Sequence, residues 1–248
     1  MVTFHNTPPT HLTLDPLAAV GVRHAFTTRH HAPIGPVSAS AGPFGDGPAL
    51  ASLGVGPGAI HYARQVHGAR CLVADDVPPG LAGVGDALIT AAPRRPLAIF
   101  TADCLAVVLA DPECRVLAVA HAGWRGTVTG LLGHLVALLV SRFGVRPAHL
   151  LAAIGPSIGP CCYEVDEPVT GPLRAAFPRE WARWARPHGP GRWWLDLWQA
   201  NADQLAAAGV RPEAIVNPRL CTSCRRDLFF SYRREGGGGR LAALALLD

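Results

Sequence analysis

The sequence predicts a mixed α/β or α+β domain, and three observations lead to this class. Apolar runs of strand length alternate with longer segments of helical period through the middle of the chain. Hairpin signals appear at its end, around a run of glycines. The 248 residues are 49% hydrophobic, which is enough for a sizeable core, and no obvious linker interrupts them. We therefore expect a single domain over residues 1–248.

The first third is predicted to hold one strand and a long loop. His24–Arg29 has the pattern of an early strand, and the run from residue 30 to residue 58 is rich in Gly and Pro, which is typical of loop. His30 and His31 lie in this Pro-flanked segment, so we expect them to face solvent rather than bind a metal.

Short strands dominate residues 71–120. Three are predicted first, at Cys71–Ala74, Gly85–Thr90 and Leu97–Phe100. Leu105–Ala110 and Val116–Ala120 are stronger apolar runs joined by an Asp-Pro-Glu turn. They predict two buried strands that form a hairpin or a neighbouring pair.

Helices are predicted in the second half. Thr127–Arg142 carries Leu or Val on nearly every face, so we expect a helix that is buried all round. Ala175–Arg186 has the pattern of a broken amphipathic helix. Asp196 with Gln199 resembles a capping box, which predicts a helix that ends at about Ala208.

The remaining apolar runs are predicted to be strands. Leu150–Ile154 predicts a further buried strand. Leu228–Arg233 and Leu241–Leu247 flank the glycine run and predict a closing hairpin, with Arg233 or Arg240 near a pocket.

Charge and composition exclude several functions. The chain has 22 basic and 18 acidic residues, and every basic residue is Arg. The lack of Lys excludes Schiff-base chemistry and a P-loop lysine. No basic cluster suggests a nucleic-acid partner, and the longest apolar stretch, near residues 131–140, is too short to span a membrane. The N-terminus lacks a secretory signal and the seven cysteines are odd in number, so we expect a cytoplasmic protein.

A candidate site lies around the central strand pair. Cys104 comes just before the first of these strands and His121 at the end of the second, followed by Arg125 and a helix start that favours anions. His67 is a third ligand candidate upstream. Zinc in enzymes typically takes three such ligands and leaves a fourth position open. The wide spacing alone is a weak signal, because only the fold can join these residues.

Two shorter motifs carry competing hypotheses. Gly155-Pro-Ser-Ile-Gly159 matches the G-x-S-x-G elbow of serine hydrolases, but the prolines around Ser157 favour an extended loop. Cys221 and Cys224 have redox or zinc-ribbon spacing, yet there is no second pair to complete a four-ligand site. We interpret this second motif as a turn.

Six strings resemble, in order, the motifs of the laccase-domain family. Members of that family are described as polyphenol oxidases, as multifunctional purine nucleoside phosphorylases and as peptidoglycan-editing factors. The strings are Gln65-Val-His-Gly, Gly85-Asp-Ala-Leu-Ile-Thr, Thr101-Ala-Asp-Cys, Ala120-His-Ala-Gly-Trp-Arg-Gly, Gly155-Pro-Ser-Ile-Gly-Pro-Cys-Cys-Tyr-Glu-Val and Phe230-Ser-Tyr-Arg-Arg. The segment from residue 30 to residue 58 departs from the family's Gly-Gly-Val-Ser turn and longer helix.

The resemblance implies a fold and a metal site. It implies two mixed β-sheets packed between helices, in a four-layer α/β/β/α arrangement. It also implies that His67, Cys104 and His121 bind zinc, with copper as the alternative metal.

The resemblance further implies phosphorolysis of adenosine, inosine or methylthioadenosine, with adenosine deaminase activity. The expected partners are a purine nucleoside and phosphate, and the expected assembly is a monomer or homodimer. Arg29, Asp103 and Arg125 are the candidate catalytic residues, and Glu164 is an alternative general acid. Substrate binding is expected from Arg29, Gln65, Arg125 and Ser157. The H-x-E and P-C-x-x-C pattern of known zinc deaminases is missing.

Other functions stay open from the sequence. Cys104 with His121 as base would suit a hydrolase that edits a peptidoglycan precursor, and a binding role without catalysis would need only the fold. A copper-dependent phenol oxidase needs additional His-rich copper sites, but the chain has no His-x-His pair and its one methionine is Met1.

Overall fold

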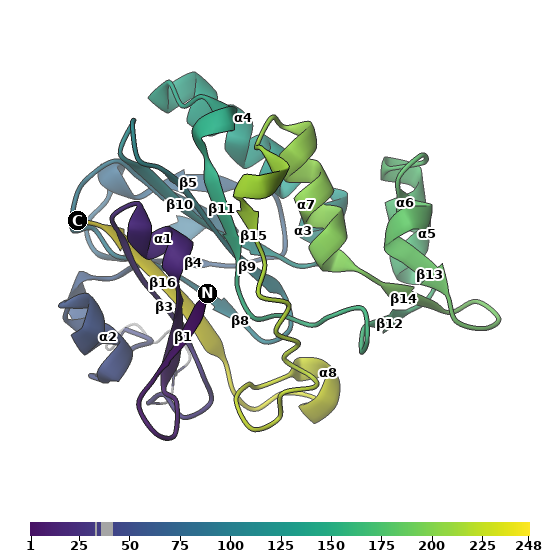
Figure 1. The fold of residues 1–248 in the computed structure, drawn as a ribbon, viewed down its shortest axis with the longest axis horizontal. Coiled ribbons are helices and arrows are strands. Elements are labelled where there is room, and N and C mark those ends of the chain that lie inside the picture. Colours follow the sequence, from purple (N-terminus) through teal and green to yellow (C-terminus); the bar gives the residue numbers. More distant parts are fainter. Residues whose placement is uncertain (33, 36–41) are drawn as a thin grey trace.

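The computed structural model describes residues 1–32, 34–35 and 42–248. Within them the chain forms two large mixed sheets and one small antiparallel sheet, with helices on their outer faces (Figure 1). This arrangement confirms the mixed α/β class. Among the described residues no helix is both long and apolar enough to cross a bilayer.

The first large sheet joins both ends of the chain. The two strands at one side of this sheet, β1 and β2, are not predicted from the sequence. β3 pairs with β16, and this pairing places residues 22–27 beside the last strand of the chain. In spatial order its strands are β1 (Val2–His5), β2 (His11–Leu14), β3 (Val22–Thr27), β16 (Leu241–Leu247), β8 (Leu97–Thr101), β4 (His61–Arg64) and β6 (Gly80–Val84).

The second large sheet contains the predicted strand pair. The two strands pair antiparallel with a short turn between them, which confirms the prediction. In spatial order its strands are β15 (Ile215–Val216), β11 (Leu151–Ile154), β9 (Leu105–Asp111), β10 (Val116–Ala122), β7 (Ala87–Thr90) and β5 (Cys71–Val73). The small third sheet has the order β12 (Glu164–Val165), β14 (Trp193–Leu195) and β13 (Ala185–Pro187).

Short and long helices complete the fold. The α-helices are α1 (Asp15–Ala19), α2 (Pro48–Leu53), α3 (Trp124–Val128), α4 (Leu131–Phe143), α5 (Glu167–Ala176), α6 (Trp181–Trp184), α7 (Leu197–Ala207) and α8 (Tyr232–Glu235). Single 3₁₀ turns lie at Pro57–Ala59, Ala74–Asp76, Pro147–His149 and Pro212–Ala214.

Three apolar clusters define the four layers. One lies between α4 and α7 and the outer face of the second sheet, one lies between the two large sheets, and one lies between the first sheet and α2. Because side chains alternate along a strand, β16 contributes Leu241 and Ala243 to the middle cluster and Ala242 and Leu244 to the cluster under α2. The central strands are therefore apolar on both faces.

The helix predicted over Thr127–Arg142 is wrong in two respects. It is divided into α3 and α4 at Gly130, whose φ of 71° interrupts the helix. It also buries only one face, and Val140 on the other side is 41% exposed. The apolar residues on every face of this segment therefore led to a wrong prediction of how much of the helix is buried.

Other boundaries need correction too. The region predicted as one broken helix over Ala175–Arg186 contains the end of α5, then α6, and then the start of β13. The predicted closing hairpin is wrong, because β16 pairs with β3 and β8 rather than with residues 228–233. The helix cap is confirmed, since Asp196 accepts a hydrogen bond from the Gln199 N–H at 2.9 Å.

The segment from residue 30 to residue 58 is not all loop. It contains α2, and the predicted loop at residues 33 and 36–41 lies outside the described residues. His30 is exposed as expected, but His31 is 8% exposed and sits within 2.8 Å of the Ala32 carbonyl oxygen.

Candidate active site

Three side chains from separate parts of the chain meet at one edge of the second sheet. A ligand atom of His67, one of Cys104 and one of His121 all lie within 4.8 Å of one another. The rings of His67 and His121 are nearly perpendicular, with centroids 4.8 Å apart. The three side chains differ in exposure: His67 is exposed, Cys104 is partly buried and His121 is buried. The fold thus joins the residues that sequence spacing alone could not.

The strand register explains two of the three positions. His121 lies in β10 opposite Ala106 of β9, so Cys104, two residues before Ala106, falls beside the end of β10. His67 follows β4 in a turn where its φ of 59° lies in the left-handed region. This conformation is uncommon for a residue with a side chain and fits a functional turn.

The lack of a side chain at Gly123 leaves room for the side chains of His67 and Cys104. A Cβ atom at this position would lie 2.8 Å from Cys104 Sγ and 3.2 Å from His67 Cδ2. We expect Gly123→Ala to keep the fold but to weaken metal binding at least about tenfold, because the thiol must rotate away. Zinc-chelator competition measures the change. Gly133→Ala in α4 is the matched control, since nothing lies within 4 Å of its added Cβ, and equal affinity in both variants would contradict the expectation.

Asp86 organises the site, although it was not selected from the sequence. Its carboxylate is fully buried, and Oδ1 lies 2.9 Å from His121 Nδ1. The same carboxylate accepts hydrogen bonds from the backbone N–H groups of Val66, His67 and Gly68 at 2.8–3.2 Å. One side chain therefore orients both histidines. Its position in the Gly-Asp-Ala-Leu-Ile-Thr string is the signal that could have identified it.

The electrostatics of the cluster favour a thiolate. Burial raises the pKa of Cys104, but hydrogen bonds and charge from His121 and His67 outweigh it and lower the pKa to about 6. Burial lowers the pKa of His121, but Asp86 and Cys104 outweigh this effect and raise it to about 9. Near neutral pH the protein without metal therefore holds a thiolate beside an imidazolium.

These two pKa values predict how metal binding depends on pH. Near pH 7 a metal must displace the proton of His121, and below about pH 6 it must also displace the proton of Cys104. We expect zinc affinity to fall by up to about tenfold per pH unit as the pH drops from 9 to 6, and more steeply below pH 6, where a second proton must be displaced. Competition with a chelator of known pH dependence measures this slope. A constant affinity between pH 6 and pH 9 would contradict the displacement of a proton from His121 by the metal.

The donor set fits a catalytic metal site. Because Asp86 engages Nδ1 of His121, the Nε2 atom is left for a metal, as in carboxylate–histidine–zinc arrangements. One sulfur and two imidazole nitrogens are ligands that zinc accepts, and three protein ligands leave a fourth position open. Among the described residues, one other group of Cys, His, Asp or Glu could hold an ion.

A cavity of about 580 Å³ opens beside the cluster. Its walls combine aromatic, basic and metal-ligand side chains, and its volume lies within the roughly 300–1,000 Å³ of small-molecule sites. The lining residues are Ala63, Arg64, Gln65, His67, Phe100, Thr101, Ala102, Cys104, His121, Tyr232 and Arg240. Arg64, Phe100 and Tyr232 were not selected from the sequence, although Tyr232 lies in the Phe230-Ser-Tyr-Arg-Arg string, which is the signal that could have identified it.

The two arginines selected as catalytic candidates lie outside this lining. Arg29 borders a neighbouring cavity of about 240 Å³, where its guanidinium covers the Phe230 ring and lies 3.4 Å from Glu235. Arg240 borders both cavities. Arg125 is exposed at the start of α3 and lies over the Trp124 ring, 4.2 Å from its centroid.

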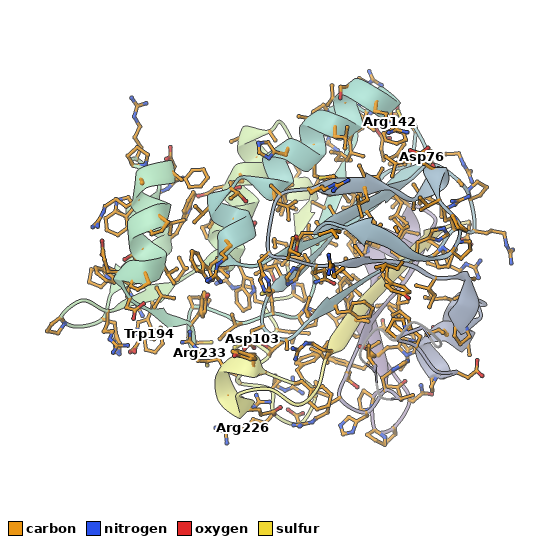
Figure 2. All side chains as sticks on the ribbon, turned by 180° about the vertical axis from the view of Figure 1, so that it is seen from behind. Asp76, Asp103, Arg142, Trp194, Arg226 and Arg233 are labelled. Atoms are coloured by element: carbon orange, nitrogen blue, oxygen red, sulfur yellow. The ribbon has the colours of Figure 1, made fainter. Side chains whose placement is uncertain are left out.

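Asp103 lies next to the cluster but its carboxylate is engaged. It accepts hydrogen bonds from the hydroxyls of Thr222 (2.6 Å) and Ser231 (3.0 Å) and from the Arg233 N–H (2.7 Å). Figure 2 shows Asp103 beside Arg233 at α8. The contacts tie the Cys104 turn to α8, which suits a positioning residue better than a proton donor.

The other candidates differ in their access to the cavity. Gln65 lines it, and its amide exchanges two hydrogen bonds with the Phe100 backbone. Ser157 is fully buried and accepts a hydrogen bond from Trp198 Nε1 at 2.7 Å, so the structure does not bring it to the cavity. Glu164 lies 3.1 Å from Arg192 in the third sheet.

Comparison with known proteins identifies similar chains. Residues 48–248 match the family model described as "Multi-copper polyphenol oxidoreductase laccase". The chain is 42% identical over 190 residues to a protein from Geobacillus stearothermophilus named purine nucleoside phosphorylase YlmD, which covers 73% of this chain and 69% of that protein. The crystal structure of that YlmD superposes with a TM-score of 0.84 and 31% identity, over 99% of this chain and 98% of the other.

Two further relatives carry related names. A purine nucleoside phosphorylase from Deinococcus radiodurans is 40% identical over 241 residues, covering 91% of this chain and 89% of the relative. Adenosine deaminase RL5, from an unknown prokaryotic organism, is 36% identical over 193 residues, covering 74% of this chain and 73% of the relative.

Proposed function

The chain belongs to the family described as multi-copper polyphenol oxidoreductase laccase, and on this premise we propose that it is a zinc-dependent purine nucleoside enzyme. It cleaves adenosine, inosine or methylthioadenosine with phosphate, and it deaminates adenosine. The observation that carries the proposal is the convergence of His67, Cys104 and His121 on the wall of a cavity of nucleoside-site size. The relatives named purine nucleoside phosphorylase and adenosine deaminase support an enzyme that acts on purine nucleosides.

The cavity supplies the groups that phosphorolysis requires. A phosphate oxygen forms a bond to C1′ of the ribose while the bond from C1′ to the base breaks and its electron pair leaves with the base. Arg64 and Arg240 line the cavity and can bind the phosphate dianion. Phe100 and Tyr232 offer aromatic faces for the purine. Arg29 and Arg125 remain proposed substrate residues. Arg64 and Arg240 are favoured for phosphate, because they line the cavity.

The metal and the protein divide the remaining work. When bound, zinc would supply a Lewis acid at the cavity wall and a means of activating water for deamination. Asp86 fixes the orientation of His121, and Gln65 holds the end of β4 against β8 through the Phe100 backbone. Both contacts keep the cavity wall rigid, which is what a preorganised site needs.

A product assay tests the proposal. Adenosine is incubated with the zinc-loaded protein, with and without phosphate, and the products are separated by HPLC. Adenine with ribose 1-phosphate, formed only when phosphate is present, indicates phosphorolysis, and inosine indicates deamination. The lack of either product from protein with a full zinc content would contradict the proposal.

Arg240→Gln should separate the two reactions. Loss of a charged hydrogen-bond donor to phosphate should raise the KM for phosphate about 10- to 100-fold. Deamination uses water instead of phosphate, so its rate should change less than about threefold. Steady-state kinetics of both reactions measure the split. Arg142→Gln is the matched control, since Arg142 pairs with Asp76 far from Asp103 (Figure 2); an equal loss in both reactions would contradict a phosphate role for Arg240.

One observation favours a second candidate function. The pKa of about 6 at Cys104, beside His121, also suits a nucleophilic thiolate in a hydrolase acting on a peptidoglycan precursor. One thiolate cannot bind zinc and attack a substrate at the same time. If added zinc inhibits turnover and iodoacetamide alkylates Cys104 in active protein, the hydrolase is favoured over the phosphorylase.

A further inference from the structure

A second cluster of cysteines lies away from the candidate active site. The four Sγ atoms of Cys161, Cys162, Cys221 and Cys224 all lie within 4.8 Å of one another. Cys224 Sγ is 3.5 Å from Cys161 Sγ and 3.4 Å from Cys162 Sγ. All four thiols are free. The sequence argument that Cys221 and Cys224 lack a second pair is therefore wrong, because the adjacent cysteines at 161 and 162 supply it.

The chain brings this cluster together through two loops. Ser157 and Cys221 form an isolated parallel bridge, in which the Ser157 N–H bonds to the Leu220 carbonyl and the Thr222 N–H bonds to the Ser157 carbonyl. The bridge aligns the loop after β11 with the turn at Cys221, so the two cysteine pairs face each other across it. A pattern search along the sequence misses this arrangement because neither half is a complete motif.

We propose that Cys161, Cys162, Cys221 and Cys224 form a structural zinc site with four thiolate ligands. Tetrahedral coordination with Zn–S bonds of about 2.3 Å places the sulfurs about 3.8 Å apart, close to the separations within the cluster. Four protein ligands close the coordination sphere, so the site holds structure rather than substrate.

The surroundings of the cluster suit a bound metal. The Gly159 N–H donates to Cys221 Sγ at 3.3 Å, a hydrogen bond that stabilises a thiolate. Cys221 is buried, whereas Cys161 and Cys224 are exposed, so an ion can enter from the surface. Joining all four cysteines by disulfides would need two bonds and an oxidant, whereas one ion can bind all four thiolates at once.

The ion would stabilise the wall of the candidate active site. The turn that carries Cys221 also carries Thr222, whose hydroxyl donates to Asp103 immediately before Cys104. The same turn leads to Tyr232, which lines the cavity. A metal bound by the four thiols therefore ties the loop after β11 to the segment that holds Thr222 and Tyr232.

Zinc content separates this site from the candidate active site. In protein purified without chelator, we expect Cys161→Ser with Cys224→Ser to lose about one zinc per chain, measured by ICP-MS. Cys114→Ser, at an exposed cysteine outside both clusters, is the matched control and should lose none. Cys104→Ala with His121→Ala should retain the zinc of the four thiols, so the proposal can hold even when the proposed function fails.

Two measurements guard against a variant that does not fold. In wild-type protein the four cysteines should be protected from iodoacetamide until zinc is removed, whereas Cys114 should react throughout. Removal of this zinc from the Cys104→Ala, His121→Ala protein should lower the melting temperature by about 5–10 °C. Equal zinc in the wild type and the double serine variant, iron in place of zinc, or a disulfide among the four cysteines of reduced protein would each overturn the proposal.

Discussion

Replacing His121 by alanine is expected to abolish phosphorolysis and deamination together and to remove one zinc per chain. Cys104→Ala should do the same, because three protein ligands hold a catalytic zinc and losing either one leaves an incomplete set. The loss of a Lewis acid corresponds to several kcal/mol of transition-state stabilisation, or a rate at least about a thousandfold lower. Zinc analysis and the HPLC product assay on the same preparation measure both effects.

The controls for this experiment lie in the same protein. His134→Ala removes an exposed histidine of α4 and Cys114→Ser an exposed thiol, and neither residue belongs to a metal-capable cluster among the described residues. Both variants should keep full activity and zinc. If Cys104→Ala lost activity while retaining all its zinc, the thiol would act as a nucleophile and the zinc proposal would fail.

The second large effect is expected at Asp86. Asp86→Ala removes the fully buried carboxylate that is the partner of the buried His121 and the acceptor of three backbone N–H groups in a part-buried turn. The buried His121 donor left unpaired costs about 1–3 kcal/mol, and the turn loses three further hydrogen bonds, so the variant should be destabilised by a few kcal/mol. Denaturant unfolding measures the change in the free energy of unfolding.

Asp86→Asn separates the positioning role from stability. The amide keeps the volume and one acceptor oxygen but loses the charge that raises the pKa of His121. We expect zinc affinity to fall about 10- to 100-fold, with a smaller loss of stability than in Asp86→Ala. Because the pKa of His121 should fall as well, the pH at which zinc affinity begins to decline should also fall. Unchanged affinity and an unchanged pH profile would mean that Asp86 only supports the turn at His67.

Parts of the fold and site follow from local sequence patterns. The strand pair β9 and β10 is readable because both runs are apolar and a short Asp-Pro-Glu turn separates them. The cap at Asp196 is readable because its partner lies three residues away. The chemistry of His67, Cys104 and His121 makes them a candidate zinc set, but their wide spacing is a weak signal, which the motif resemblance strengthened. In each local case, the interaction that decides the structure joins residues that are near in sequence.

Tertiary structure alone decided the remainder. The register of β9 against β10 and the turn after β4 brought the three ligands together, and Asp86 became the common partner of the two histidines. The pairing of Ser157 with Cys221 assembled the four-cysteine cluster from two incomplete motifs. The sequence by itself determined which side chains could bind metal and which segments could become strands. Which of them meet was decided by long-range pairing, because such contacts depend on the packing of whole sheets, which no local pattern records.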